Sequence, residues 1–167
     1  MVRLASLVAV ATLFLSGCVY SFTGGGLPRH IRTIAIIPFE NVTPQAGIST
    51  DLYTRMQQQL PRDLGVRLAE ERVADAVIRG RIVAFDEPPV VARPTQPGQQ
   101  LDVVQAQVRV TVEAEIYDLR ENRPLWANRS LSVIGNYRPD QEQLLTGQAR
   151  AIEEITRRII EGAQSQW

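Results

Sequence analysis

Apolar and polar residues alternate strictly in one long segment, Leu101–Leu119. Successive side chains of a strand point to opposite faces of a sheet, so this pattern predicts a long strand with one buried face and one solvated face. The buried set is Val104, Ala106, Val108, Val110, Val112, Ala114 and Ile116, and the solvated set includes Gln107, Arg109, Thr111 and Glu113.

Three other segments predict further strands of the same sheet. Ile31–Phe39 contains a continuous apolar run. Ala76–Phe85 is apolar around Gly80, which indicates a bulge or a close packing contact. Leu125–Ile134 follows a turn-forming segment and is expected to return along the long strand. Val66–Leu68 is a candidate for a further short strand. The prolines between Pro88 and Gly98 predict a loop.

Two segments carry apolar residues at helical spacing. In Ile48–Leu60 the apolar positions stand four apart. Thr43-Pro44 offers a helix start, Ser49 or Thr50 is a second candidate cap, and Pro61 is expected to end the helix. A second helix is expected from about Asp140 to Ala163. The order strand, helix, strand, strand, strand, helix predicts a two-layer α+β domain. Its four-stranded, mostly antiparallel sheet would have both helices packed on one face.

The N-terminus has a pattern of its own. Leu4–Leu15 is almost wholly apolar, has the length of a signal-peptide core and is too short to span a bilayer. It ends in Leu15-Ser16-Gly17-Cys18, which resembles the lipobox of bacterial lipoproteins. The resemblance implies cleavage before Cys18 and acylation of that cysteine; the alternative is a plain signal peptide with an incidental cysteine. We expect a signal peptide over 1–17, a lipidated flexible tether over 18–30 and a single domain over 31–167.

Composition narrows the functions open to the domain. Without Arg3 the mature chain would have 17 arginines, no lysine and 18 acidic residues, so no global basic field for nucleic acid exists. The one cysteine would be taken by lipid and the one histidine, His30, lies in the expected tether. These two facts leave no basis for a histidine-assisted nucleophile or for a cysteine or histidine metal site. A binding or assembly module without cofactor or metal is therefore expected, rather than an enzyme.

Several short segments then point to a family. They are Tyr20-Ser21-Phe22, Gly26-Leu27-Pro28, Ile31–Ile36, Phe39–Thr43 and Ala74–Ile82. Their order and spacing resemble the lipopolysaccharide-assembly lipoproteins, LptE, over essentially the whole mature chain. The resemblance implies two helices on a four-stranded sheet. It also implies a lipid-anchored protein on the periplasmic side of the outer membrane, which plugs and helps to assemble an LptD-like β-barrel that inserts lipopolysaccharide into the outer leaflet.

Two other functions stay open at this point. The stretch Ile34–Asn41 also resembles lipoproteins that activate cell-wall synthases or build secretion pores. A lipid-anchored enzyme is the third option. Co-purification separates the first two: an outer-membrane barrel supports the LptE function. A penicillin-binding protein, or further copies of the chain, supports the synthase activator or secretion pore.

Two arginines are candidate ligands for lipopolysaccharide phosphates. If the last three strands form antiparallel hairpins, the loops that carry Arg93 and Arg138 lie at the same end of the sheet. Each arginine is followed by a proline, which limits the entropy lost on fixing the loop. Guanidinium groups bind phosphate by charge-assisted, bidentate hydrogen bonds. Ordinary solvation of the loops is the alternative, and Arg79, Arg81 and Arg109 are the next candidates.

Overall fold

A helix joins two neighbouring strands of the sheet, so these strands run parallel. The computed structural model describes residues 26–88, 91–94 and 101–165, with the backbone alone for 91–94 and 101–104; Cys18 and the expected signal peptide lie outside them. Strand β1 (Thr33–Ile36) pairs in parallel with β4 (Ala76–Asp86), and α2 (Ile48–Leu64) lies between them in the sequence. Parallel neighbours need such a crossover, which a two-residue turn cannot supply.

Within the described residues the sheet has seven strands and mixed pairing, rather than the four mostly antiparallel strands expected. The long antiparallel part was predicted correctly: β6 (Leu101–Asp118) pairs with β4 on one side and with β7 (Arg123–Tyr137) on the other. The additional strands are short, and β2 (Glu40–Asn41) and β3 (Arg67–Leu68) pair in parallel with β4 and β1. Strand β3 lies within Val66–Leu68, where a short strand was expected, whereas the two residues of β2 carry too little alternation to be recognised.

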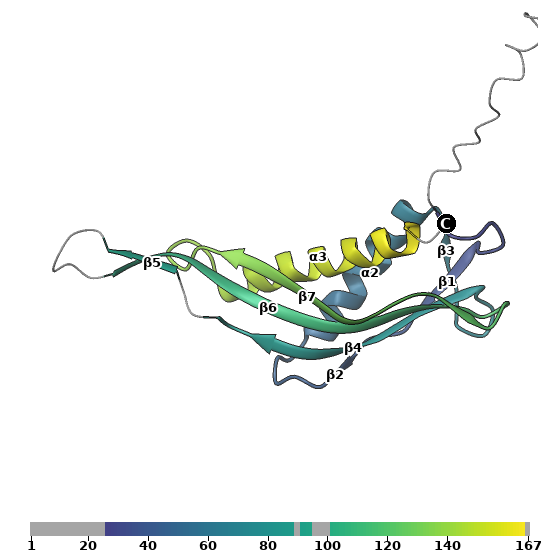
Figure 1. Ribbon diagram of the computed structural model, residues 1–167, viewed down its shortest axis with the longest axis horizontal. Helices are drawn as coiled ribbons and strands as arrows, with labels where there is room; N and C mark the ends of the chain where they lie inside the picture. The colour runs from purple at the N-terminus through teal and green to yellow at the C-terminus, as the bar shows by residue number, and fades with distance from the viewer. Residues whose placement is uncertain (1–25, 89–90, 95–100, 166–167) are drawn as a thin grey trace, which may run out of the picture.

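Both helices cover one face of the sheet, as predicted (Figure 1). Helix α3 (Leu144–Gln164) packs on β7 and β6 and also contacts α2. Between the layers lies a continuous apolar core, to which the buried face of β6 and the inner stripes of both helices contribute. Its largest fully buried side chains include Met56, Leu60, Ile116, Ile155 and Ile159. The α+β, two-layer architecture is confirmed.

Helix α2 differs from the prediction at both ends. It begins at Ile48, with Gly47 as the N-cap residue, and not at Thr43-Pro44. It also continues through Pro61 to Leu64 and ends at Gly65, whose φ of 65° is the left-handed conformation typical of a helix C-terminus. Proline removes one hydrogen-bond donor, but a single lost bond in the last turn does not end a helix whose next residues still find backbone partners.

The proline-rich segment before β6 is only partly a loop. Residues Val91–Pro94 form strand β5, which pairs antiparallel with the first residues of β6 along the same edge that β4 uses further on. Strand β7 starts its pairing only at Ala106, so the β5–β6 hairpin projects beyond it (Figure 1). Proline is tolerated in an edge strand because its missing N–H can face away from the ladder. Pro94 therefore did not exclude a strand in the segment that was predicted to be a loop.

Candidate functional site

The register of β6 brings the two sequence-predicted arginines to one end of the sheet. Arg93 lies in β5 opposite Asp102, and Arg138 directly follows Tyr137, which lies opposite Ala106. The two positions are therefore about three residues apart along β6, roughly 10 Å, and on opposite sides of that strand. The side chain of Arg93 is not among those that the structure describes.

Arg138 stands beside a second arginine, Arg150, and a carboxylate between them. The backbone N–H of Arg138 donates to Glu142 Oε2 at 2.8 Å. Arg150 donates to both oxygens of the same carboxylate, from Nη1 to Oε2 at 3.0 Å and from Nη2 to Oε1 at 2.6 Å. The hydrogen bonds from Arg150, then that from the Arg138 N–H, lower the pKa of Glu142. This carboxylate therefore stays charged at neutral pH and holds Arg150 in place.

The guanidinium of Arg138 is more available than that of Arg150. Its side chain is 58% exposed, and its nearest acidic partner is Asp140, with 3.9 Å between Nη2 and Oδ2. A groove of about 510 Å³ opens at this end. Its lining residues are Gln105, Asn136, Tyr137, Arg138, Glu142 and Arg150. A cation beside an aromatic ring and two amides can bind a phosphate or carboxylate group.

The other three candidate arginines lie on the open face of the sheet. Arg79 Nε pairs with Glu115 Oε2 at 3.3 Å, and Arg81 Nε pairs with Glu40 Oε2 at 3.2 Å. Both line a groove of about 650 Å³, in which Glu40, Glu113 and Glu115 stand against Arg79, Arg81 and Arg129. The charges balance there. Arg109 lies in β6 opposite Ile134, nearer the end of the sheet that carries the β5–β6 hairpin and Arg138 (the hairpin end). Of Arg79, Arg81 and Arg138, the last has its acidic partner furthest away, at 3.9 Å, and is the most available for a phosphate group.

The opposite end of the sheet holds an arrangement that the sequence analysis missed. His30 was expected to lie in the tether, but its Nε2 lies 2.6 Å from Oδ2 of the fully buried Asp118. The other oxygen of Asp118 accepts the backbone N–H groups of Arg120 and Glu121 at 2.8 and 3.0 Å. Burial raises the pKa of Asp118, but these hydrogen bonds and that of His30 outweigh it and lower the pKa. His30, Asp118 and Glu121 could gather around a cation, but hydrogen bonds already use both Asp118 oxygens.

Asp75, which directly precedes β4, holds the start of β1 in place. Its Oδ2 accepts the backbone N–H groups of Arg32 and Thr33 and the Thr33 hydroxyl, each at 2.9 Å, and its Oδ1 lies 2.5 Å from Arg120 Nη2. Burial raises the pKa of this carboxyl; the hydrogen bonds and the Arg120 charge outweigh burial and lower the pKa to about 2. The Ala74-Asp75-Ala76 motif was the sequence signal for this arrangement, and the role of Asp75 in it is structural.

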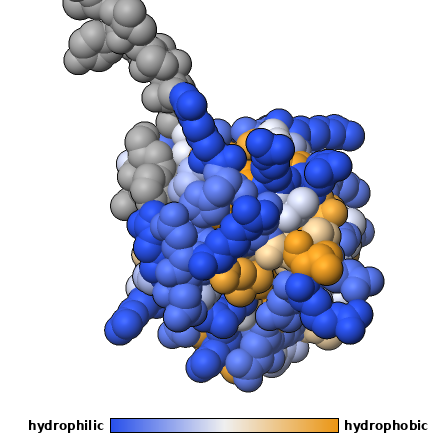
Figure 2. Space-filling view, turned by 90° about the vertical axis from the view of Figure 1, so that its right-hand side faces the viewer, coloured by the Kyte–Doolittle hydropathy of each residue, from blue (hydrophilic) through white to orange (hydrophobic). Residues whose placement is uncertain are grey.

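The end that carries Asp75 and Asp118 also exposes apolar side chains. Leu68, Val73 and Leu119 are 41%, 71% and 39% exposed. Figure 2 views this end, and apolar patches interrupt its otherwise hydrophilic surface. Within the described residues, neither helix has the length and apolar character needed to cross a membrane.

Comparisons with solved structures show a shared fold. The hypothetical protein CT253 from Chlamydia trachomatis is similar over 81% of this chain and 99% of its own, with 10% identity and a TM-score of 0.55. Protein XCC0632 from Xanthomonas campestris is similar over 84% of this chain and 90% of its own, with 10% identity and a TM-score of 0.51. A comparison with curated protein sequences gave no match.

The family comparison is more specific. The model of the family described as "LptE: Lipopolysaccharide-assembly" matches residues 31–165, which is nearly the whole described domain and includes both helices and every strand of the sheet. The match confirms the resemblance carried by the strand and motif order, and it is to a family of non-enzymatic assembly proteins. The chain belongs to the lipopolysaccharide-assembly family, LptE.

Proposed function

We propose that this protein is an outer-membrane lipoprotein that plugs an LptD-like β-barrel, helps it to assemble, and contacts the lipopolysaccharide that the barrel inserts. The family match over residues 31–165 carries the proposal. A plug must be a rigid body without a chemical step of its own. The domain fits this requirement because one continuous core joins the sheet to both helices.

The lipopolysaccharide contact is placed at the hairpin end of the sheet. Lipid A offers phosphate groups, which guanidinium groups bind through paired, charge-assisted hydrogen bonds. Arg138 projects its guanidinium there with a single distant acidic partner, and Arg93 lies at the same end by register. Glu142 holds Arg150 but leaves the exposed Arg138 side chain available. Arg93 and Arg138 therefore act together on one glycolipid headgroup.

Depletion of the protein tests its role as a barrel partner. The expected result is a loss of correctly assembled barrel from the outer membrane, together with less lipopolysaccharide at the cell surface. An affinity pull-down from detergent-solubilised outer membrane should recover the barrel. Normal barrel and surface glycolipid after depletion would contradict the proposal.

Charge reversal tests the glycolipid site separately. Replacing Arg93 and Arg138 together by glutamate should weaken lipopolysaccharide binding at low ionic strength by at least about tenfold, since two cations become two anions. The matched control reverses Arg62 and Arg72, which are exposed and do not line the groove beside Arg138, and it should bind lipopolysaccharide like the unchanged protein. Unchanged affinity in a folded Arg93/Arg138 variant would move the site to Arg79, Arg81 or Arg109.

A further inference from the structure

Strand β7 has a free edge. Within the described part of the chain it pairs only with β6. In an antiparallel pair, residues alternate between those bonded to the opposite strand and those whose N–H and C=O point away from it. The carbonyl of Asn136 accepts a hydrogen bond from Arg150 Nη1 at 2.5 Å, so Asn136 is of the second kind. The register is unbroken from Tyr137 to Leu131, so Ile134 and Ser132 also direct their backbone groups outward.

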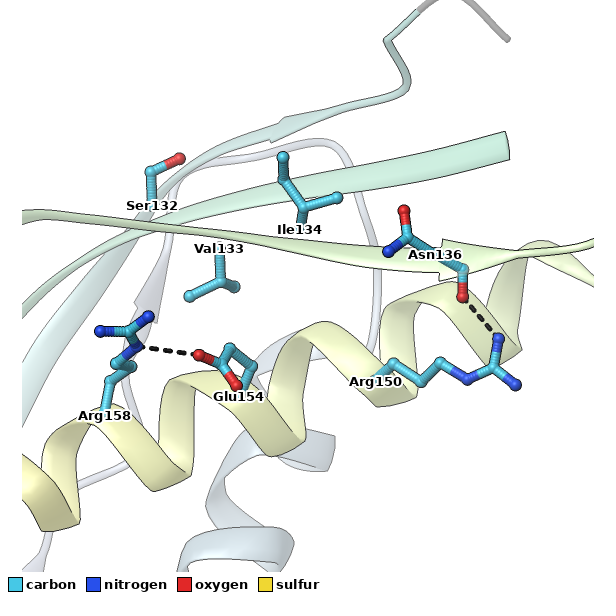
Figure 3. Close-up of a pocket in the computed structure, with 7 residues that line it drawn as sticks. All are labelled: Ser132, Val133, Ile134, Asn136, Arg150, Glu154 and Arg158. Atoms are coloured by element: carbon cyan, nitrogen blue, oxygen red, sulfur yellow. Dashed lines mark hydrogen bonds and ion pairs between the residues drawn. The ribbon is translucent and has the colours of Figure 1, made fainter. Parts of the chain in front are cut away.

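A groove of about 630 Å³ lies beside this edge, and one of its walls contains Ser132, Ile134 and Asn136. Its other wall is the outer stripe of α3, formed by Arg150, Glu154 and Arg158 (Figure 3). Three alternate strand residues span about 13 Å, and three helix residues four apart span about 12 Å. The backbone edge and the charged stripe therefore extend over the same length.

We propose that this groove binds an extended segment of a partner protein, which adds to the sheet as a further strand beside Ser132–Asn136. Binding between an edge strand and a neighbouring helix is an established way to recognise extended peptides, because main-chain hydrogen bonds give affinity and side chains give specificity. Arg150 already supplies a donor to the outward carbonyl of Asn136, so the backbone groups open to an incoming strand are those of Ser132 and Ile134. The inference does not rest on the proposed function.

The side chains around the groove define the partner's chemistry. Arg158 uses Nε for Glu154 at 2.8 Å, and its two Nη groups have no partner within the described residues. On the opposite face of the strand, Ile134 is 44% exposed. Successive side chains of an added strand would face α3 and the Ile134 side alternately. The segment therefore carries an acidic residue toward Arg158 and an apolar residue beside Ile134.

A second copy of the chain fits this edge poorly in the register centred on Ile134. Antiparallel pairing of two β7 strands centred on Ile134 would place the two α3 helices antiparallel on one face of the joined sheet. Arg150 of one copy would then approach Arg158 of the other, and the two Glu154 side chains would approach each other. Like charges in such pairs are destabilising. The charge pattern thus favours a different, acidic partner.

The test uses the full-length chain purified in detergent and a fluorescent hexapeptide of alternating glutamate and valine. Fluorescence anisotropy should show saturable binding, and a lysine–valine peptide should bind at least about tenfold more weakly. Arg158→Glu should weaken binding of the glutamate peptide to a similar degree. The matched control, Arg72→Glu, reverses a charge whose side chain is 89% exposed and should bind like the unchanged protein.

Backbone pairing is tested independently of charge. Bound peptide should slow hydrogen exchange at the amides of Ser132 and Ile134, which face outward in the free protein. Ile134→Pro should abolish binding without unfolding the domain, because its N–H takes no part in the β6–β7 ladder. Ile134→Thr keeps that N–H and should retain most of the binding. The proposal is overturned if neither peptide binds, if protection appears elsewhere, or if the chain instead forms dimers that Ile134→Pro disrupts.

Discussion

At the scale of single residues, the absence of a side chain at Gly135 sets how closely α3 approaches β7. A Cβ at Gly135 would overlap the carbonyl oxygen of Gly147 and lie 2.8 Å from the backbone nitrogen of Ala151. Both neighbours are backbone atoms of the helix, so no side-chain rotation can relieve the contact. The whole helix would have to move away from the strand.

Gly135→Ala should therefore lower the free energy of unfolding by about 3 kcal/mol, at the upper end of the usual effect of overpacking. Gly65→Ala is the control. Gly65 has a φ of 65° and no atom within 4 Å of an added Cβ, so only backbone strain of about 1 kcal/mol is expected. Urea denaturation of both variants measures the difference, and equal losses would show that α3 can shift freely.

Asp75 should make stability depend on pH in the acid range. Its pKa of about 2 lies below the value of about 3.9 expected in the unfolded chain. A lowered pKa means that the stabilisation is complete above pH 4 and is lost as the pH falls from about 4 to 2. The shift corresponds to about 2 to 3 kcal/mol.

Asp75→Asn should lower the free energy of unfolding at neutral pH and flatten its fall between pH 4 and pH 2. Thermal unfolding followed at several pH values measures both effects. Glu71→Gln, at an exposed position, should leave the curve unchanged. An unaltered pH profile in Asp75→Asn would assign the acid sensitivity to other carboxylates, such as Asp118.

At the scale of elements, length decided what the sequence could predict. The alternation along β6 extends over many residues, and the structure buries Ala106, Val108, Val110, Val112, Ala114 and Ile116 as expected. The parallel pairing of β1 with β4 was missed, although the helix between them was recognised and is the connection that such pairing requires. Strands β2 and β5 escaped because one has two residues and the other lies among prolines.

The candidate site was likewise predictable only in part. Hairpin reasoning placed Arg93 and Arg138 at one end of the sheet, since antiparallel topology follows from turn positions alone. Arg150 was missed because its role depends on α3 folding back along β7, which puts it beside the Asn136 carbonyl. The edge groove likewise depends on which backbone groups of β7 face outward, and no local pattern reports that.

Pro61 offers a test of the helix that continued further than expected. Within α2, its ring removes the donor that would bond the Gln57 carbonyl. Pro61→Ala restores that donor and should raise the free energy of unfolding by about 1 kcal/mol, because the regained bond outweighs the added freedom of the unfolded chain. Pro124→Ala, at the start of β7, restores no helical bond and should give no gain. Denaturation midpoints that fall for Pro61→Ala would mean that the proline holds the last turn in place.

At the scale of the whole molecule, the two ends of the sheet differ in character. The hairpin end presents Arg138 and the groove beside it, whereas the other end exposes Leu68, Val73 and Leu119. The described chain enters at this second end, where His30 is bound to Asp118. Cys18 precedes Gly26 by eight residues, a reach of at most about 28 Å. Lipid on Cys18 would therefore attach the protein to the membrane from the end that exposes these apolar residues.

Mass spectrometry of the mature protein should find an N-terminal Cys18 that carries several acyl chains. Each buried CH₂ contributes about 0.8 kcal/mol, so two or three chains hold a protein firmly where a single chain would not. Cys18→Ser should move the protein from the membrane fraction to the soluble fraction with its fold unchanged. Adding Ser21→Cys to that variant supplies a thiol outside the Leu-Ser-Gly-Cys spacing and should not restore the membrane fraction. A membrane-bound Cys18→Ser protein would instead assign attachment to the exposed apolar residues around Val73.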